Sequence, residues 1–226
     1  MANPPSVSPL LATLLPLSLS RPRGSNAAVD GLRTTLLTIA ATHQAYLLAK
    51  ARAPQDIVGR ALDLAVGFRA EARALLAAAD AAEAEPLHHG RSAEDVLVRL
   101  AGAVMGSVVD VMLGGHGYSK NLDAALALVR ACGGPDVLLQ QRQAGSIALD
   151  GTGRSAVDPV RLLLEILAGH EVFAGLVGGT GATLINEGTW WSATGQLSYH
   201  RESIENHFGT TRAVLSLVAR VRPAAH

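Results

Sequence analysis

The stretch LLLEILAGHEVFAGLV, residues 162–177, decides the fold class of this sequence. It is a long apolar run with helical spacing, and Asp158-Pro159 precedes it as a cap followed by proline at the favoured first helical position. These features predict a buried α-helix. His170 and Glu171 lie side by side within it, so the chemistry of the helix depends on whether they form a metal site, an acid–base pair or neither.

Two further helices are predicted nearer the N-terminus. Asp30 is expected to cap the first, which ends before Pro54, and Asp56 is expected to start the second, which ends before Pro86. The expected apolar stripe of the first is Leu32, Leu36, Ile39, His43 and Tyr46, and that of the second is Leu64, Phe68, Ala72 and Leu75.

The remaining helices follow at short intervals. One has a capping-box-like start at Ser92 and Asp95, and the next ends at Gly133-Gly134-Pro135. Their expected stripes are Leu97, Leu100, Val104, Val108 and Val111, and then Leu122, Leu126 and Val129. Residues 143–158 are expected to form a loop, 178–202 to be irregular, and about 210–221 to form the last helix. The pattern predicts an all-α fold of five to six main helices packed as antiparallel hairpins.

Composition excludes several classes of protein. The 226 residues contain 19 Lys+Arg and 19 Asp+Glu, so the basic excess expected of a chain that grips nucleic acid is missing. The one cysteine, Cys132, excludes an internal disulfide and a cysteine-based structural zinc site. Residues 1–27 are expected to form a Pro/Ser-rich arm and 28–226 a single helical domain. With no window long enough for a membrane span, we expect no membrane partner.

The histidines give no pattern of catalysis or metal binding. A zincin helix needs His-Glu-x-x-His, but position 174 is alanine. His170 and Glu171 point in directions about a quarter-turn apart, so we expect His170 to be a hydrogen-bonded core residue. His43 repeats the pattern beside Ile39 and Tyr46, and it is interpreted in the same way.

The glycine-rich segment after residue 174 is interpreted as a helix stop and a loop, because it matches neither Gly-x-Gly-x-x-Gly nor a P-loop. Trp190-Trp191 either stacks on a ligand or partner or anchors the loop to the core, and both readings stay open. We expect no catalytic, cofactor or metal residues. The candidate ligand or partner contacts are His43, His170, Trp190 and Trp191.

Six phrases, read in order, resemble one known domain. They are LRTTLLTIAATHQAYLL, FRAEARALL, EDVLVRLAGAVMGSVVDVMLGG, NLDAALALVRACGG, LLLEILAGHEVFAGL and IENHFGTTRAVLSLVARV. Together, over about residues 28–222, they resemble the regulatory domain (middle homology region, or fungal-specific transcription factor domain) of fungal zinc-cluster transcription factors. His170 and Glu171 would then be scaffold residues.

The resemblance implies a nuclear regulatory domain without catalysis. Family members carry six N-terminal cysteines that bind zinc and read DNA, and this chain has one cysteine. We therefore expect no cofactor in this chain, because zinc would belong to the absent cluster, and DNA contact only through an attached or partner module. A homodimer or a regulatory protein is the expected partner. The family's domain usually continues past the last helix of this chain, so the resemblance implies that the domain over 28–226 is incomplete at its C-terminal end. The chain would be a fragment, a truncated gene model or a stand-alone relative.

Two alternatives are kept. The first is a small helical metabolite-binding protein or enzyme, soluble and intracellular, with a pocket near His170 and Trp190. The second is an interaction protein whose helical faces are its only working surface. A ligand that raises thermal stability would favour the first alternative, and a retained homodimer would favour the second over the enzyme.

Overall fold

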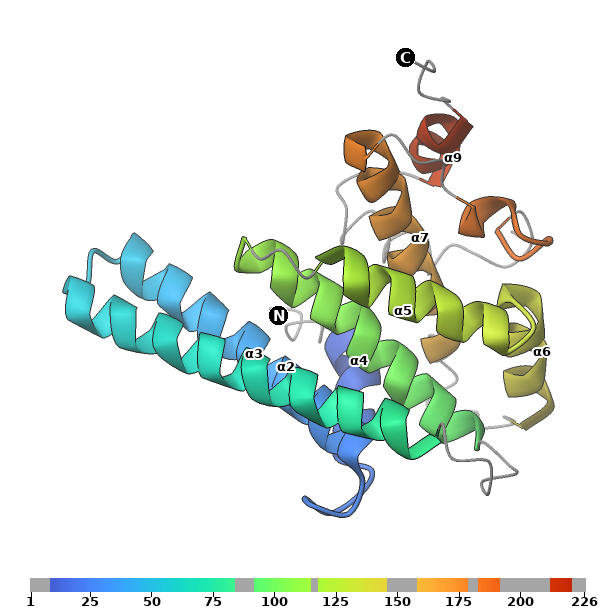
Figure 1. Cartoon of the computed structure of the whole chain (residues 1–226). Coiled ribbons are helices and arrows are strands. Elements are labelled where there is room, and N and C mark those ends of the chain that lie inside the picture. The colour runs from blue at the N-terminus through green and yellow to red at the C-terminus, as the bar shows by residue number, and fades with distance from the viewer. Residues whose placement is uncertain are drawn as a thin grey trace, which may run out of the picture. The chain divides into compact units, whose positions relative to one another are not determined.

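The computed structural model describes residues 9–83, 92–114, 118–145, 158–178, 183–191 and 212–220. Within these ranges the chain is helical and has no strand, which confirms the all-α prediction (Figure 1). Its elements are α1 (Pro9–Ser18), α2 (Ala27–Lys50), α3 (Gln55–Glu83), α4 (Ala93–Met112), α5 (Tyr118–Ala131), α6 (Pro135–Gly145), α7 (Pro159–Gly178), the 3₁₀ turn η1 (Leu184–Asn186) and α9 (Arg212–Arg220). None of these described helices combines the length and apolarity that crossing a membrane requires.

The chain divides into two compact units. The N-terminal unit comprises Leu14–Asn121, and the C-terminal unit comprises Met1–Thr13 together with Leu122–His226. The N-terminal unit therefore holds α2, α3 and α4, and the C-terminal unit holds α6, α7, η1 and α9. The division expected from the sequence, an arm over 1–27 and one domain over 28–226, stays a prediction, and the unit boundaries fall at other positions.

Helix α2 starts earlier than the sequence predicts. Asn26 is its N-cap, and the Asn26 side chain accepts a hydrogen bond from the backbone N–H of Val29 at 3.0 Å. The prediction that Asp30 caps this helix is therefore wrong. Asp30 instead lies in the first turn, where its carboxylate accepts from the Gly24 N–H at 2.7 Å and pairs with Arg33. A carboxylate in a first turn is favourable because it faces the positive end of the helix dipole.

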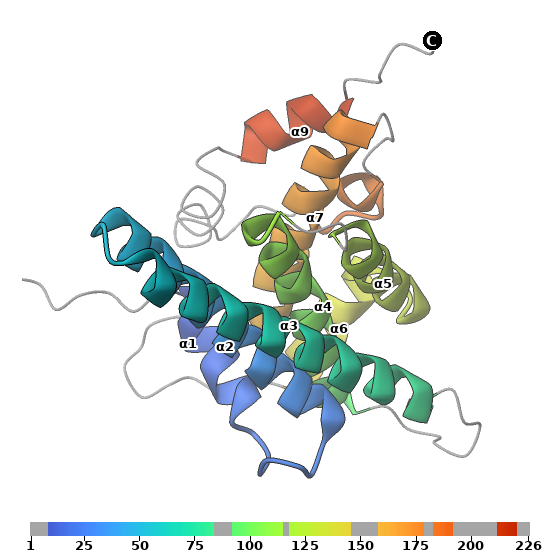
Figure 2. The ribbon, with the colours of Figure 1, turned by 60° about the vertical axis from the view of Figure 1, so that its left-hand side comes forward.

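Helices α2 and α3 form an antiparallel hairpin and lie side by side in both ribbon views (Figures 1 and 2). Small and hydroxyl-bearing residues make up much of the buried face of α2, including Gly31, Thr35, Thr38, Thr42 and Ala45. The three threonine hydroxyls donate to backbone carbonyls one turn back, at 2.8 to 2.9 Å. Because the hydroxyls are satisfied locally, these side chains can be buried against a neighbouring helix.

The predicted stripe of α2 is therefore wrong beyond its first residues. Leu32 is buried, but His43 is exposed and Tyr46 is 59% exposed. In α3, Ala72 is buried as predicted, but Leu64 is 50% exposed and its neighbour Ala65 is buried instead. In both helices the small side chains face the partner, which brings the two backbones close together.

Close packing at Leu76 yields a prediction. A Cβ added at Gly31 would lie 2.8 Å from Leu76 Cγ and 3.3 Å from the Leu76 backbone nitrogen. Gly31→Ala should therefore lower the free energy of unfolding by about 1–3 kcal/mol through overpacking. Gly67 on α3 has nothing within 4 Å of an added Cβ, so Gly67→Ala should raise it by about 1 kcal/mol through helix propensity. Urea unfolding of both variants checks this, and equal effects of the two substitutions would contradict the packing.

Helix α4 follows the sequence prediction more closely. The Ser92 side chain accepts from the Asp95 N–H at 3.1 Å, which confirms the expected cap. Leu97, Leu100 and Val104 are buried as predicted. Val111 is 58% exposed, so the predicted apolar stripe is wrong near the end of the helix.

Burial raises the pKa of Tyr118, at the start of α5, to about 12 from its usual 10. A raised pKa means that the unfolded chain loses this phenolic proton at lower pH than the folded chain does. The stabilising contribution of the protonated form is therefore complete below about pH 10 and is lost as the pH rises through about 12. The stability of Tyr118→Phe, measured by urea unfolding, should depend less on pH in this window than that of the wild type, and identical profiles would contradict the assignment.

In the C-terminal unit, α7 is the most deeply buried helix described. Asp158 caps it as predicted, with its Oδ1 accepting from the Val160 N–H at 2.9 Å. Buried residues of α5 are Leu122, Leu126 and Val129, also as predicted. Gly133 and Gly134 follow α5 with φ of +89° and +92°, which suits the end of a helix. Helix α6 was not predicted from the sequence, and the expected loop over 143–158 is wrong for residues 143–145, which belong to this helix.

Candidate functional site

The four candidate contact residues lie in different surroundings. His43 lies on α2 in the N-terminal unit, is exposed, and stacks on Tyr46 with ring centroids 6.4 Å apart. The expectation that His43 is a core residue is therefore wrong. His170, Trp190 and Trp191 lie in the C-terminal unit, where all three are buried. Whether any of the four contacts a ligand or partner stays a prediction.

Glu171 holds the turn that follows α7. It is 7% exposed, and its carboxylate accepts from the Thr183 N–H at 2.9 Å, the Thr183 hydroxyl at 2.7 Å and the Leu184 N–H at 2.8 Å. Among the described residues, no group of three or more His, Cys, Asp or Glu side chains is arranged to hold a metal ion. The contacts of Glu171 are those of a structural carboxylate that satisfies backbone donors at η1.

The tryptophan pair anchors the same segment. Trp190 is 1% exposed and its indole N–H donates to the Leu184 carbonyl at 2.9 Å. The Trp191 indole N–H donates to the Ser216 hydroxyl on α9 at 2.7 Å, and the two rings meet edge to face with centroids 5.3 Å apart. Of the two interpretations left open by the sequence, these contacts favour the anchor.

Charged residues of α5 and α6 complete the attachment of this segment. Arg130 donates to Thr183 at 2.6 Å and to Glu187 at 3.1 Å, while Asp136 accepts from the Thr189 N–H at 2.7 Å. Gly188 has φ of +73°, and a Cβ there would lie 2.0 Å from Asp136 Oδ2, so only glycine fits. The segment 183–191 is thus held to α5, α6, α7 and α9 by its own hydrogen bonds.

Burial also acts on the first turn of α7. It lowers the pKa of Arg161, and the negative charge of Asp158 acts in the opposite direction. Arg161 donates from Nε to Glu165, a residue with 0% exposure, at 3.2 Å. This pair is one turn apart on the same helix, so it supports α7.

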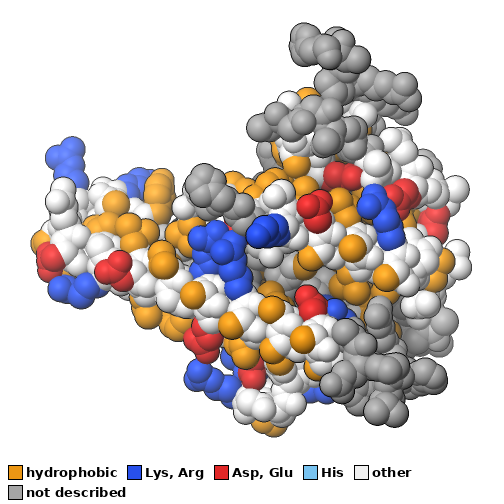
Figure 3. Space-filling model, in the orientation of Figure 1, with side chains coloured by type: hydrophobic (Ala, Val, Ile, Leu, Met, Phe, Trp, Pro, Cys, Tyr) orange, Lys and Arg blue, Asp and Glu red, His pale blue; other side chains and the backbone are white. Residues whose placement is uncertain are grey.

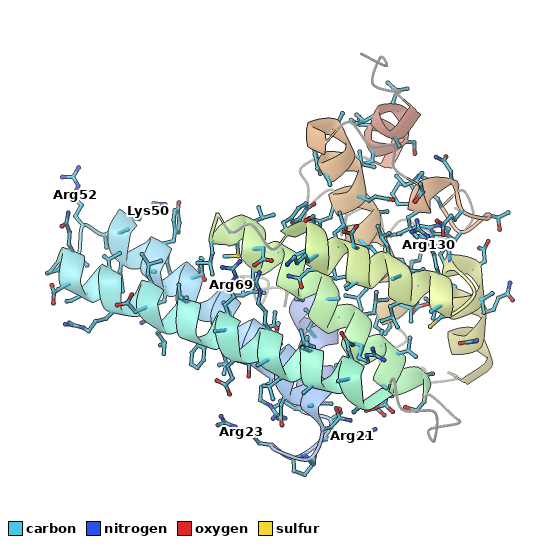
Figure 4. The ribbon with its side chains drawn as sticks, in the orientation of Figure 1. Arg21, Arg23, Lys50, Arg52, Arg69 and Arg130 are labelled. Carbon is cyan, nitrogen blue, oxygen red and sulfur yellow. The ribbon has the colours of Figure 1, made fainter. Side chains whose placement is uncertain are left out.

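The N-terminal unit contains a different charged cluster, centred on Asp110 of α4. Asp110 is 1% exposed, so its carboxyl group is buried among the packed helices. Arg69 Nε donates to Asp110 Oδ1 at 2.6 Å, and Arg73 Nη2 donates to both carboxylate oxygens at 3.0 and 2.9 Å. Asn121 Nδ2 donates to Oδ2 at 2.8 Å. Figure 4 labels Arg69, which projects from α3.

A small, partly open hollow adjoins this cluster, with a volume of about 20 Å³, which is room for about one water molecule. It is lined by Thr35, Thr38, Arg69, Ala72, Arg73, Leu76, Gly106, Val109, Asp110 and Asn121. Two guanidinium groups and one carboxylate give this lining a formal charge of +1. Figure 3 shows basic side chains gathered where Figure 4 labels Arg69.

None of the polar residues of this pocket was predicted from the sequence to belong to a site. Signals were present: Arg69 and Arg73 are one turn apart on α3, and Asp110 interrupts an apolar run on α4. A single sequence does not say that the two helices face each other at these positions, so the cluster emerges only from the fold.

Comparison with known proteins identifies the family to which the chain belongs. Over residues 2–222 the chain matches the family model of the fungal specific transcription factor domain. The match covers almost the whole chain, so the chain belongs to this family of transcription-regulatory domains, which confirms the resemblance drawn from its helices. No curated protein matches it. No solved structure matches it either.

Proposed function

We propose that this chain is the regulatory body of a fungal transcription factor. It acts on transcription through a DNA-binding module that is either attached to it or supplied by a partner, and it performs no catalysis of its own. The observation that carries the proposal is the family match over residues 2–222. The nucleus is the expected location, because that is where such a domain would act.

The charge of the chain supports indirect contact with DNA. Lys+Arg and Asp+Glu both number 19, and many described arginines are committed to carboxylates within the protein, among them Arg21, Arg33, Arg69 and Arg99. A chain whose basic groups are neutralised internally has few left to replace counterions on a phosphate backbone. We therefore assign the recognition of a DNA sequence to another module.

The α2–α3 hairpin supports a protein partner, either a second copy or another regulator. It exposes large apolar side chains on both helices, and Figure 3 shows hydrophobic side chains over this part of the N-terminal unit. They include Tyr46, Leu47, Leu62, Leu64 and Val66, each between 41% and 59% exposed. Large apolar side chains left exposed on one hairpin support a protein partner, because apolar surface of this kind is common at protein interfaces.

The experiment that tests the proposal is selection of DNA by the purified chain. The 226-residue chain is incubated with a random-sequence duplex library at physiological salt, and retained DNA is sequenced over successive rounds. We expect no enriched motif and weak retention that falls steeply with added salt. Enrichment of one motif, confirmed by fluorescence anisotropy, would overturn the assignment of DNA reading to another module.

The alternative of a metabolite binder or enzyme with a pocket near His170 and Trp190 stays a prediction. Both residues are buried, and the contacts of Trp190 are those of an anchor. The hollow beside Asp110 lies in the other unit.

A further inference from the structure

We infer that the chain forms a weak homodimer in which α3 packs antiparallel against α3 of a second copy, through an exposed stripe of six residues. The stripe lies wholly on α3, within the N-terminal unit. The inference chooses a second copy from the two kinds of partner named under the proposed function. Association itself is a property of the chain, and only its meaning for transcription rests on the proposed function.

The stripe follows heptad spacing along α3. Its residues recur at intervals of three and four, which places them on one face of the helix, and all of them are exposed. They are Ile57, Arg60, Leu64, Gly67, Glu71 and Ala74. The buried small residues of α3, Ala65 and Ala72, are spaced differently and face α2 instead. The stripe is therefore a second face of α3, which the described part of the chain leaves uncovered.

The charges of this stripe are self-complementary. Arg60 and Glu71 lie near its opposite ends, about 16 Å apart along the helix axis. When two identical helices pack antiparallel around a two-fold axis between Ala65 and Val66, Arg60 of one copy faces Glu71 of the other. Two-fold symmetry repeats this ion pair at the other end of the contact. The chain itself supplies the complement of its own charge order, which is why we assign this face to a second copy.

The middle of the stripe is apolar and open. In the same register Leu64, which is 50% exposed, faces Gly67 of the second copy, and Ile57, which is 37% exposed, faces Ala74. A Cβ added at Gly67 meets nothing within 4 Å, so an approaching side chain finds room there. Each apolar layer thus sets a large side chain against a small one, as interdigitated packing requires.

The charged ends can be shared with a second copy. Arg60 pairs with Asp56 at 3.0 Å, and Glu71 pairs with Arg23 at 3.9 Å. The four side chains are between 48% and 83% exposed, so each existing pair contributes at most about 1 kcal/mol. Two arginines and two carboxylates would meet at each end of the dimer contact. The charges therefore balance, and neither existing pair has to break.

The dimer should be weak. A contact along one face of one helix belongs with the small interfaces, which bury less than about 1,200 Å² in total and are typical of transient complexes. At the low micromolar concentrations suited to urea unfolding, the chain should therefore be monomeric. The stability changes expected for Gly31→Ala and Gly67→Ala are those of the monomer.

The test is sedimentation velocity of the full chain from low to high micromolar concentration. We expect the wild type to pass reversibly from monomer to dimer. Arg60→Glu and Glu71→Arg should each weaken association at least tenfold, because each sets like charges against each other at both ends. The double variant Arg60→Glu/Glu71→Arg restores opposite charges and should associate within about threefold of the wild type. An equimolar mixture of the two single variants should form a heterodimer, since each supplies the charges that the other lacks.

Lys50→Glu is the matched control. Lys50 is exposed, lies on α2 away from the stripe and is labelled in Figure 4. Its replacement changes the net charge as much as Arg60→Glu does, so its association should stay that of the wild type. Circular dichroism of each variant checks that it is folded, and the double variant gives an independent answer if a single variant is not.

Three results would overturn the inference. They are a monomer at every concentration, which would leave the face to a different partner, equal weakening by Lys50→Glu and Arg60→Glu, and a double variant that associates no better than the single ones. None of them changes the expected outcome of the DNA selection, because a monomer can also act through another module. The inference and the proposed function therefore fail separately.

Discussion

Replacing Asp110 with alanine is expected to lower the free energy of unfolding by about 3 kcal/mol. The substitution removes the carboxylate that accepts from Arg69, Arg73 and Asn121, and it leaves the guanidinium of Arg69 largely buried without its acceptor. Breaking a buried pair typically costs about 3–5 kcal/mol. We place the loss at the lower end because the Arg73 side chain is 45% exposed and water can replace part of its pairing. Urea unfolding followed by circular dichroism measures the change.

The matched control for this prediction is Asp63→Ala. Asp63 is an exposed aspartate in the N-terminal unit, on α3. Its replacement should change the free energy of unfolding by no more than about 0.5 kcal/mol. Equal losses for Asp63→Ala and Asp110→Ala would mean that the cluster around Asp110 does not hold α3, α4 and the start of α5 together.

Replacing Glu171 with alanine is expected to cost about 2–4 kcal/mol and to release the segment 183–191. Glu171 supplies the acceptor for the N–H groups of Thr183 and Leu184, and a buried donor left unsatisfied costs about 1–3 kcal/mol. Trp190 is bonded to the carbonyl of Leu184, so loss of the turn should expose its ring. We expect a red shift and increased acrylamide quenching of tryptophan emission, alongside a lower urea midpoint.

Glu187→Ala is the control within the same segment. Glu187 pairs with Arg130, but the two side chains are 30% and 49% exposed, so this ion pair should contribute at most about 1 kcal/mol. Tryptophan emission should stay that of the wild type. An unshifted spectrum in Glu171→Ala would contradict the anchoring role.

Local rules predicted several helix ends from the sequence. Ser92 and Asp158 cap α4 and α7, and the glycine pair follows α5, because each of these signals acts within one turn of its own residue. The apolar stripe of α5 was also predicted, since Leu122, Leu126 and Val129 repeat at helical spacing with no competing stripe. When the apolar residues of a helix follow one clear period, only one face of that helix can be the buried one.

The face of α2 could not be chosen in the same way. Its sequence has large apolar residues on one side and threonine, glycine and alanine on another, and hydrophobicity alone favours the first. The structure buries the small side, where Thr38 is 0% exposed and Gly31 packs against Leu76, and it exposes Tyr46. Two helix backbones can approach closely only where the side chains between them are small. Which face of α2 packs in this way can be told only when its partner helix is known.

The candidate site was missed for a related reason. His170 and Trp190 were predicted as contact residues because histidine and tryptophan often contact ligands. Arginines in an alanine-rich helix such as α3 instead indicate a solvent-exposed face, so Arg69 and Arg73 were not predicted. Asp110 is 41 and 37 residues away from Arg69 and Arg73 in the chain. Contacts over such separations are set by how the helices pack, which no local pattern encodes.

The measurement that tests the central claim most directly is a tethered reporter assay in a fungal cell. The chain is fused to a heterologous DNA-binding domain, and transcription of a reporter with the matching sites is compared with that from the DNA-binding domain alone and from the unfused chain. Glu171→Ala, expressed at the same level, serves as a destabilised control. Our account predicts that only the tethered wild-type chain changes reporter transcription. Transcription equal to that with the DNA-binding domain alone, at matched protein levels, would contradict a regulatory role for this chain.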